Sequence, residues 1–462
     1  MFSATTYQAR RAALRARLQK GVIVMHGNHD SPMNYRDNSY PFRQDSSFLY
    51  FFGLDQPGLV GVIDLDSGED WVLGEDASLE DVVWTGPSPT LAERAVLCGV
   101  TRTAPRRMLA LTVARAIASE RTIHYLRPYR ADTLAELAEL VGLTAARVLE
   151  GYSLCLTRAV VALRERKSDE EIAQIESALK VTALMHSAAM KASRPGVVEH
   201  NVVGLMEGIV RQHDLQLAYS TIFSKRGEVL HNHSHAATLE PGDLVVNDAG
   251  CSSRLGYASD ITRTLPVGGK LVGLKRDLYG LVLESNERVI AALKPGVRFS
   301  DAHKLGCRVM VQGLKSLGCF RGDPDEIVES GAYAIFFQCG IGHQLGLDVH
   351  DMEALGEDHV GYEPGVARSS LFGMKYLRLA KPVQAGFVVT VEPGIYIIPA
   401  LLERWRAEGR YAGLIDYQAF DQLRGIGGIR IEDDVLVTET GSRVLGPHIV
   451  RTPDELEAAM AG

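Results

Sequence analysis

Four carboxylates stand in apolar, strand-like runs in the second part of the chain. Asp248 ends the run LVVND, Asp260 precedes ITRTLPV, Glu392 interrupts VVTVEPG, and Glu432 lies in GIRIEDDV. Burying a carboxylate costs several kcal/mol unless it is paired or bound to a metal. A single acid of this kind is usually paired. Four in one buried sheet predict a shared cation site.

The stretch FFQCGIGHQLGLDVHD, residues 336–351, supplies a candidate nitrogen ligand, His343. Four carboxylates and one imidazole form an oxygen-rich set, which suits Mn²⁺, Co²⁺ or Zn²⁺ rather than a structural thiolate zinc site. Four negative charges balance two dications, whereas one dication would leave two charges uncompensated. The residues therefore predict a two-metal site, whose typical chemistry is hydrolysis by a metal-activated water.

These residues need a sheet and flanking helices to bring them together. Two Pro-Gly-Val turns, at 195–197 and 295–297, each lie between helical patterns and predict a duplicated helix–turn–helix unit. Strand patterns follow each unit. The combination predicts a mixed α+β domain with a curved antiparallel sheet.

The chain of 462 residues is longer than one hydrophobic core usually serves, so two domains are expected. The first 150 residues alternate short strands with helices, including a hairpin around residues 66–68. Ser168 with Glu171 forms the capping-box signature of a helix start. The boundary is expected between residues 160 and 168, giving domains 1–163 and 164–462.

Composition excludes several classes of protein. Apolar residues make up 46% and charged residues 23%, with a net charge of −8, which is typical of a globular protein that has no nucleic-acid partner. No apolar run reaches the roughly 18 residues of a membrane span. Six scattered cysteines without a CxxC pair indicate reduced thiols and a cytoplasmic location.

Four motifs in order, DAG…GYASDITRTLPV, GIGHQLGLDVHD, VVTVEPGIY and GGIRIEDDV, resemble the pita-bread metallopeptidases. Within that family they are similar to prolidase and aminopeptidase P, which cleave the bond before proline. FRQDSSFLYFFGLDQPG is similar to the family's N-terminal domain. The resemblance implies an α/β two-domain protein, with a creatinase-like mixed α/β domain followed by an α+β pita-bread domain of pseudo-twofold symmetry. It also implies a homodimer.

The resemblance assigns a role to each metal-site residue. Asp248 would hold one ion, His343 and Glu392 the other, and Asp260 and Glu432 would bridge both. The ions would be two divalent metals, Mn²⁺ first, with Co²⁺ or Zn²⁺ as alternatives. In the implied mechanism a bridging hydroxide attacks the scissile carbonyl, and Glu392 transfers the proton to the proline nitrogen.

The resemblance also assigns the substrate contacts. His231 in EVLHN and His350 in LDVHD match histidines that contact substrate and stabilise the tetrahedral intermediate. Arg378 in KYLRLAK matches an arginine that holds a substrate carboxylate. Arg430, two residues before Glu432, would orient the metal ligands from outside.

The expected substrates are proline-containing di- or oligopeptides. The interval of 40 residues from Glu392 to Glu432 and the long insertion between His343 and Glu392 favour an Xaa-Pro dipeptidase. Xaa-Pro aminopeptidase is the alternative. A non-peptidase hydrolase and a metal-free binding module of the same fold also remain open.

Three features depart from the family pattern. The hairpin DAGCSSRLGYASD is one residue longer than usual. HNHSH places His231, His233 and His235 at alternate positions, which is also a zinc-site pattern. Cys339 stands where relatives have a histidine. If its stretch is extended, the thiol points toward the metals, either as a ligand or, as we prefer, as a neutral wall of the proline pocket.

Overall fold

The computed structural model describes residues 1–461 and divides the chain into two compact units. The first comprises Met1–Arg164 and Met352–Val360, and the second Glu165–Asp351 and the chain from Gly361 onward. The two-domain α/β architecture is confirmed. The return of residues 352–360 to the first unit was not predicted. Within that unit the Tyr152 hydroxyl hydrogen-bonds His359 Nε2 at 2.9 Å.

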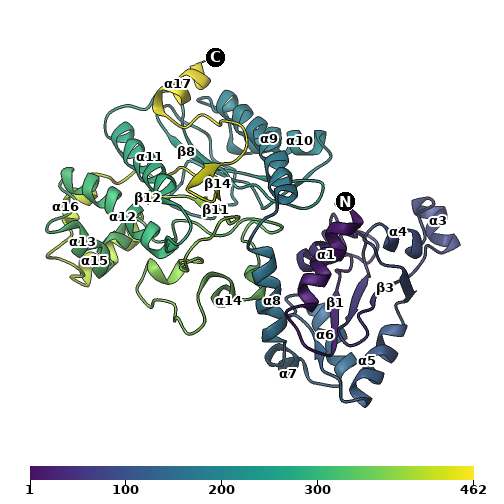
Figure 1. The fold of residues 1–462 in the computed structure, drawn as a ribbon. Coiled ribbons are helices and arrows are strands. Elements are labelled where there is room, and N and C mark those ends of the chain that lie inside the picture. The colour runs from purple at the N-terminus through teal and green to yellow at the C-terminus, as the bar shows by residue number, and fades with distance from the viewer. Residues whose placement is uncertain (462) are drawn as a thin grey trace. The chain divides into compact units, whose positions relative to one another are not determined.

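The first unit is a five-stranded mixed sheet, in the order β4-β3-β2-β1-β5, with helices around it (Figure 1). Its strands are β1 (Val22–His26), β2 (Val60–Asp64), β3 (Asp70–Gly74), β4 (Arg102–Pro105) and β5 (Ile123–His124). Its helices are α1 (Ala4–Arg15), α2 (Ser46–Phe52), α3 (Leu79–Thr85), α4 (Leu91–Val96), α5 (Met108–Ala118), α6 (Ala131–Val141), α7 (Ala145–Glu150) and α8 (Leu154–Arg164). The returning segment forms η2 (Glu353–Leu355) and most of α14 (Glu357–Gly361).

The interior strand β1, which lies between β2 and β5, is apolar at nearly every position because both of its faces are buried. Val22 and Val24 pack with residues of α5 in one core cluster. On β2, a Cβ on Gly61 would lie 2.1 Å from the Phe52 ring of α2, so the sheet and α2 are in close contact. The predicted hairpin around residues 66–68 is confirmed by antiparallel pairing of β2 with β3.

The second unit positions the acidic residues with two three-stranded antiparallel sheets, which an isolated bridge between Thr262 and Glu432 connects as two halves, and it contains two further two-stranded sheets. Its strands are β6 (Gln216–Leu217), β7 (Ile222–Ser224), β8 (Leu244–Asp248), β9 (Cys251–Ser252), β10 (Thr262–Pro266), β11 (Val388–Val391), β12 (Gly394–Tyr396), β13 (Gly428–Arg430), β14 (Asp433–Val437) and β15 (Ser442–Val444). Its α-helices are α9 (Asp169–Ala192), α10 (Glu199–Gln212), α11 (Leu274–Ala292), α12 (Phe299–Ser316), α13 (Pro324–Ser330), α15 (Pro399–Ala407), α16 (Tyr417–Asp421) and α17 (Pro453–Ala461). Short 3₁₀ turns are η1 (Ala332–Ile335) and η3 (Met374–Tyr376).

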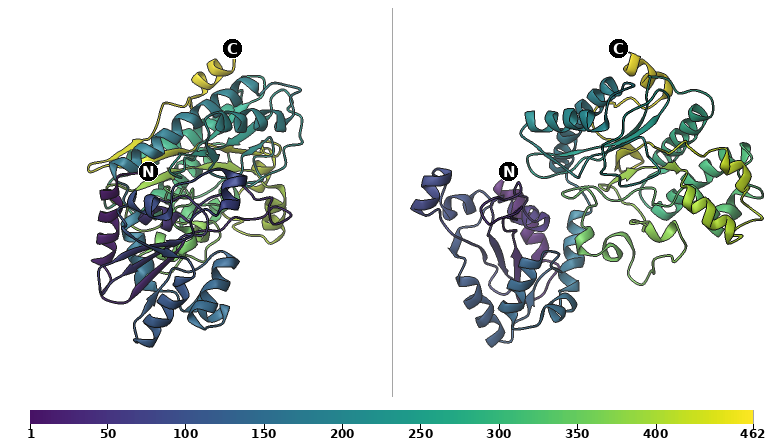
Figure 2. Two further views of the ribbon diagram at one scale, coloured as in Figure 1. Left: turned by 90° about the vertical axis from the view of Figure 1, so that its right-hand side faces the viewer. Right: turned by 180° about the vertical axis from the view of Figure 1, so that it is seen from behind.

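Two helix pairs enclose these strands. Both views from opposite sides show the strands between the α9–α10 pair and the α11–α12 pair (Figures 1 and 2). Helix α9 begins with the predicted capping box between Ser168 and Glu171. Among residues 1–461, no helix has both the length and the apolar character required to cross a membrane.

The two helix–turn–helix units are equivalent in their backbone bonding. Gly196 N donates to Leu239 O at 2.8 Å, and Gly296 N, 100 residues later, donates to Val383 O at 2.9 Å. Strand β8 begins five residues after Leu239, and β11 five residues after Val383. The predicted duplication is therefore present, and the final residue of β8, Asp248, is equivalent in register to Glu392, which follows β11.

Candidate active site

The first pair of acids is held by a tight antiparallel hairpin. Asp248 ends β8, where it pairs with Thr262 of β10, and Asp260 lies two residues before β10. A Cβ on Gly250 would lie 1.9 Å from Ser259 O, so the close approach of the two chains requires glycine there. The extra residue of this hairpin leaves both flanking acids buried side by side.

The second pair comes from the other half of the sheet. Glu392 follows β11, and Glu432 precedes β14, which pairs with β11. Glu432 N donates to Thr262 O at 3.1 Å, and the Thr262 hydroxyl donates to the Glu432 carboxylate at 2.6 Å. Thr262 thus joins the two halves and brings their acids to one place.

His343 reaches the acids from an irregular segment that lies against β11. Thr390 N donates to His343 O at 2.9 Å, and Glu392 N donates to Ile341 O at 2.8 Å. A Cβ on Gly342 would lie 2.0 Å from Thr390 O, which explains the glycine before the histidine. The expected extended run is only partly regular, because strand-type pairing is limited to a bridge between Gln344 and Val389.

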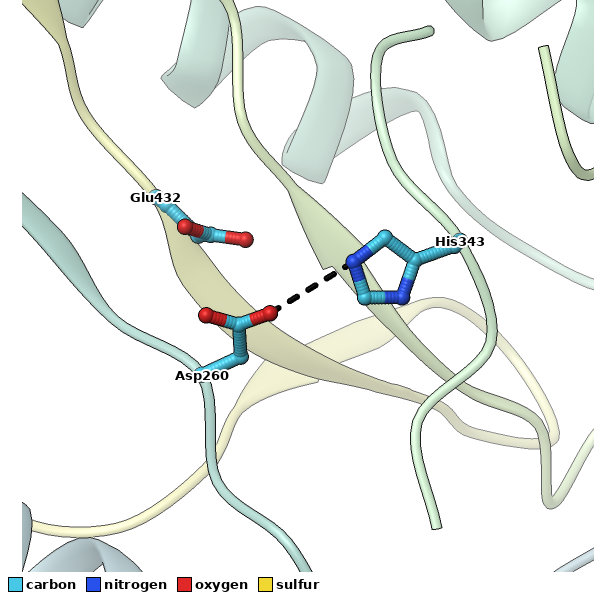
Figure 3. A group of neighbouring side chains, drawn as sticks. All are labelled: Asp260, His343 and Glu432. Atoms are coloured by element: carbon cyan, nitrogen blue, oxygen red, sulfur yellow. Dashed lines mark ion pairs between the residues drawn. The ribbon is translucent and has the colours of Figure 1, made fainter. Parts of the chain in front are cut away.

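The structure brings the predicted ligand residues together. One ligand atom each from Asp260, His343 and Glu432 lies within 4.8 Å of the others, and Figure 3 shows the three side chains directed at one another from separate segments. His343 Nε2 is 3.5 Å from both Asp260 Oδ2 and Glu392 Oε1. Asp248 is linked to Asp260 through Tyr219, whose hydroxyl is 2.6 Å and 2.5 Å from their Oδ1 atoms.

The tautomer of His343 suits a metal ligand. Its Nδ1 lies 3.0 Å from Gln344 O, and a carbonyl oxygen can only accept a hydrogen bond. Nδ1 therefore carries the proton, and the lone pair of Nε2 faces Asp260 and Glu392.

Crowding of buried acids perturbs their protonation. Burial, together with Asp260 and Asp248, raises the pKa of Glu392 to about 7 although Arg430 opposes the shift. Burial and the neighbouring carboxylates raise the pKa of Glu432 well above its usual range. Burial also acts to raise the pKa of Asp260, but the combined influence of His343, the Tyr219 hydroxyl and His350 outweighs it and the pKa is lowered. Such a cluster of acids fits cations, which would relieve the repulsion.

Arg430 supports the acids from beside the cluster. Its guanidinium forms a buried ion pair with Asp248. Its Nε donates to the Thr262 hydroxyl and one terminal nitrogen to the Tyr396 hydroxyl, both at 3.0 Å.

A cavity of about 740 Å³ opens onto these residues. It is lined by all five acid and histidine candidates, by the proposed substrate residues His231, His350 and Arg378, and by Arg430. The rings of His343 and His350 lie edge to face with centroids 4.3 Å apart. Phe372, Tyr376 and Leu401 form part of an apolar wall. The arrangement can hold a small peptide beside a cation cluster.

The three histidines of HNHSH separate in the fold. His231 and His233 line the cavity, whereas His235 Nδ1 is 3.1 Å from Phe223 O. Among residues 1–461, none of the three belongs to a cluster of three ligand residues, so no HxHxH metal site is formed. Burial and the charges of Arg430 and Arg378 lower the pKa of His231.

Cys339 also lines the cavity. Burial, followed by the charge of Glu392, raises the pKa of its thiol to about 12, so it is neutral at ordinary pH. It lies outside the ligand cluster of Asp260, His343 and Glu432.

Four polar residues of the site were not predicted from the sequence. Tyr219 lies outside the four motifs, and Tyr396 ends the motif VVTVEPGIY without belonging to its acidic pattern. Thr262 stands two residues after Asp260, so strand alternation would place both on one face, and this alternation was its one available signal. Asp434 is fully buried and accepts a hydrogen bond from Asp260 N at 3.1 Å, a contact that depends on tertiary pairing.

Comparison with protein families agrees with this geometry. The model of metallopeptidase family M24 matches residues 173–439, and the model of the aminopeptidase P N-terminal domain matches residues 7–124. The chain belongs to metallopeptidase family M24. The resemblance predicted from the motifs is confirmed.

Individual relatives of this M24 protein cover nearly its whole length. The Xaa-Pro aminopeptidase of Escherichia coli K12 is 33% identical over 478 residues, covering 98% of this chain and 97% of the relative. The human Xaa-Pro dipeptidase is 31% identical over 455 residues, covering 96% and 89%. The structure of Zn-substituted E. coli aminopeptidase P in complex with product has a TM-score of 0.82 at 30% identity, covering 100% of this chain and 98% of that one.

Proposed function

We propose that this protein hydrolyses the peptide bond before proline and uses two divalent metal ions, with Mn²⁺ as the first expectation and Co²⁺ or Zn²⁺ as alternatives. Membership of family M24 and the names of its relatives support the reaction class. The observation that carries the proposal is the buried cluster of Asp260, His343 and Glu432 at the cavity, with Asp248 and Glu392 beside it.

The donor set supports a dinuclear centre. Four carboxylates and the Nε2 of His343 converge from both halves of the sheet. Two dications would balance four carboxylate charges. Burial and then the repulsion of neighbouring carboxylates raise the pKa of Glu392 and Glu432, and such ions would relieve that repulsion. The ions would supply Lewis-acid activation of water and of the scissile carbonyl.

The side chains around the cavity have complementary proposed roles. Glu392, whose pKa burial and the neighbouring acids raise to about 7, is the proposed proton carrier to the proline nitrogen. His350 and His231 face the substrate space and would stabilise negative charge on the carbonyl oxygen. Arg378 would bind the substrate carboxylate, and Arg430 holds Asp248 in place.

Dipeptides of the type Xaa-Pro are the favoured substrates. Arg378 on the cavity wall supports recognition of a free carboxylate directly after proline. The interval of 40 residues between Glu392 and Glu432 supports the same choice. Xaa-Pro aminopeptidase is the second candidate, supported by near-complete coverage of E. coli aminopeptidase P in structure.

The test compares the metal-loaded enzyme on Xaa-Pro dipeptides and Xaa-Pro-Yaa tripeptides. A dipeptidase should have the higher kcat/KM on dipeptides, because an arginine clamp discriminates for a free carboxylate. Equal or greater kcat/KM on tripeptides would assign the enzyme as an aminopeptidase. Absence of hydrolysis on both would contradict the proposed reaction.

Metal content tests the dinuclear centre. Protein purified without chelator should hold two equivalents of metal, and Asp260→Asn should lose tight binding because it removes a bridging charge. Asp301→Asn, an exposed aspartate on α12, serves as the matched control and should keep both ions. Two tightly bound ions in Asp260→Asn would refute the bridging role.

A homodimer in the cytoplasm completes the proposal. On α3 of the first unit, the side chains of Leu79, Val83 and Trp84 are 82%, 72% and 79% exposed, and an apolar face of this kind supports self-association. All six cysteines are free thiols, which supports a reducing compartment. Light scattering would give the molar mass in solution.

A further inference from the structure

The first three residues of the second unit, 165–167, include two buried charged side chains, Glu165 and Lys167. Lys167 Nζ lies 2.9 Å from Asp351 Oδ2, and these side chains are 1% and 0% exposed. Glu165 Oε2 lies 2.5 Å from Lys381 Nζ. One short segment therefore makes two ion pairs, in which Lys167 supplies the positive charge of one and Glu165 the negative charge of the other. Each partner stands close in sequence to a proposed substrate residue, Asp351 next to His350 and Lys381 three after Arg378.

The Lys167 pair fixes the loop that carries both histidines of the site. Asp351 N donates to Gln344 O at 2.9 Å, and the same oxygen accepts the Nδ1 proton of His343 at 3.0 Å. A Cβ on Gly346 would lie 2.5 Å from Asp351 Oδ2, so the carboxylate lies directly against the loop backbone. Holding Asp351 in place therefore holds the residues on either side of it in the loop.

The Glu165 pair acts in the same way on the segment that carries Arg378. Lys381 N and Ala380 N both donate to Gly361 O, at 3.0 Å and 2.8 Å. A Cβ on Gly361 would lie 1.7 Å from Arg378 O, so this backbone is tightly packed. The Glu165 carboxylate anchors the end of the segment.

The segment is itself tied to the metal-site sheet. Lys167 N donates to Gly386 O at 2.8 Å, and Gly386 N donates to Val437 O at 2.9 Å. Gly386 leads into β11, which ends beside Glu392. The segments that carry His350 and Arg378 are therefore held in a fixed position relative to β11, the strand that leads to the proposed metal ligand Glu392.

We infer that Lys167 and Glu165 are positioning residues, which fix His350 and Arg378 relative to the metal-site sheet through buried ion pairs with Asp351 and Lys381. This inference rests on the proposed Xaa-Pro hydrolysis for the roles of His350 and Arg378. Stability alone explains such pairs poorly, because desolvation offsets the attraction and apolar replacements often stabilise as well. A fixed geometry for two substrate segments gives the pairs a function that apolar residues would not supply.

The experiment separates the two pairs by their kinetic effects. Lys167→Met should lower kcat on the order of tenfold because His350 loses its alignment, and Lys167→Arg should recover most of it. Glu165→Gln should instead raise KM for Xaa-Pro dipeptides on the order of tenfold, with less effect on tripeptides, because Arg378 is displaced. Partial unfolding lowers the active fraction but does not raise KM for one substrate class.

Lys304→Met is the matched control. It removes an ion pair with Glu329 on α12 and α13, and neither residue lines the cavity. Its kcat and KM should equal those of the wild type. Metal content and thermal midpoint are measured for every variant, and rates are expressed per folded, metal-loaded enzyme.

A second readout needs no turnover. In ¹⁵N-histidine spectra of Zn²⁺-loaded protein, whose metal is diamagnetic, the His350 ring signals should shift in Lys167→Met and remain unchanged in Lys304→Met. Unmoved His350 signals together with unchanged kinetics per folded enzyme would overturn the inference. If the wild type hydrolyses no Xaa-Pro substrate, the proposed function fails, while the spectra still decide whether Lys167 positions His350.

Discussion

Replacing Tyr219 with phenylalanine isolates one hydroxyl at the junction of two proposed metal ligands. That hydroxyl is 2.6 Å from Asp248 Oδ1 and 2.5 Å from Asp260 Oδ1. Burial and the two carboxylates raise the pKa of Tyr219 well above its usual value, so the proton remains on the oxygen. The change to phenylalanine removes the donor and keeps the ring.

The expected loss of metal affinity can be worked out from the number of hydrogen bonds that the Tyr219 hydroxyl can donate. A hydroxyl has one proton, so Tyr219 supplies one charge-assisted donor shared between two carboxylates, worth about 1.5–3 kcal/mol. Removing a group that orients a metal-binding carboxylate typically weakens metal affinity by about 10–100-fold. We expect Tyr219→Phe to weaken Mn²⁺ binding by a factor in that range, with a parallel loss of activity at limiting metal.

Calorimetric titration of chelator-stripped protein with Mn²⁺ measures the affinity. Tyr279→Phe is the matched control, because the fully buried Tyr279 hydroxyl donates to Arg451 O at 2.7 Å and contacts no carboxylate of the site. It should lose about 1 kcal/mol of unfolding free energy and leave Mn²⁺ affinity unchanged. Equal Mn²⁺ affinity in Tyr219→Phe and wild type, with both proteins folded, would refute the role of the hydroxyl in orienting the acids.

Three further predictions address specificity, Cys339 and acid stability. Arg378→Gln should raise KM most for dipeptides; an equal rise for tripeptides would argue against a carboxylate clamp. Cys339→Ala should keep both ions and Cys339→His should raise kcat by about fivefold, the equivalent of a polar contact of about 1 kcal/mol; an ion lost in the alanine variant would make the cysteine a ligand. Burial lowers the pKa of His186 to about 4 and that of His303 to about 3. Below pH 6.5 the unfolded chain therefore binds protons that the folded chain does not, and stability falls by up to about 1.4 kcal/mol per pH unit per histidine. The thermal midpoint should drop less between pH 7 and pH 5 in His303→Gln than in wild type; identical drops would contradict this.

Much of the fold could be predicted because local signals agreed with the tertiary structure. The β2–β3 hairpin was readable from a turn between two apolar strands, and α9 from the Ser168–Glu171 capping box. The duplicated Pro-Gly turns indicated two equivalent helix pairs. The return of residues 352–360 to the first unit had no such signal, because it depends on contacts such as Tyr152 with His359.

Local sequence patterns were enough to predict a cation site and to name its candidate residues. Charged residues in apolar strand runs are costly to bury, so Asp248, Asp260, Glu392 and Glu432 had to have partners, and their type and number favoured cations. Together with His343, these residues could be named before any fold was known. The reason is that burial and charge are properties of each local stretch of chain.

The groups that support those residues could be recognised only from contacts between distant segments. Tyr219 lies between Asp248 and Asp260, and Lys167 lies against Asp351, through contacts that join segments far apart in the chain. Neither residue differs in its local pattern from an ordinary buried tyrosine or a surface lysine before a helix. Their roles arise from the pairing of strands and the packing of loops, which place a hydroxyl or an ammonium beside a buried carboxylate. Such a donor is recognised only when its acceptor is in place.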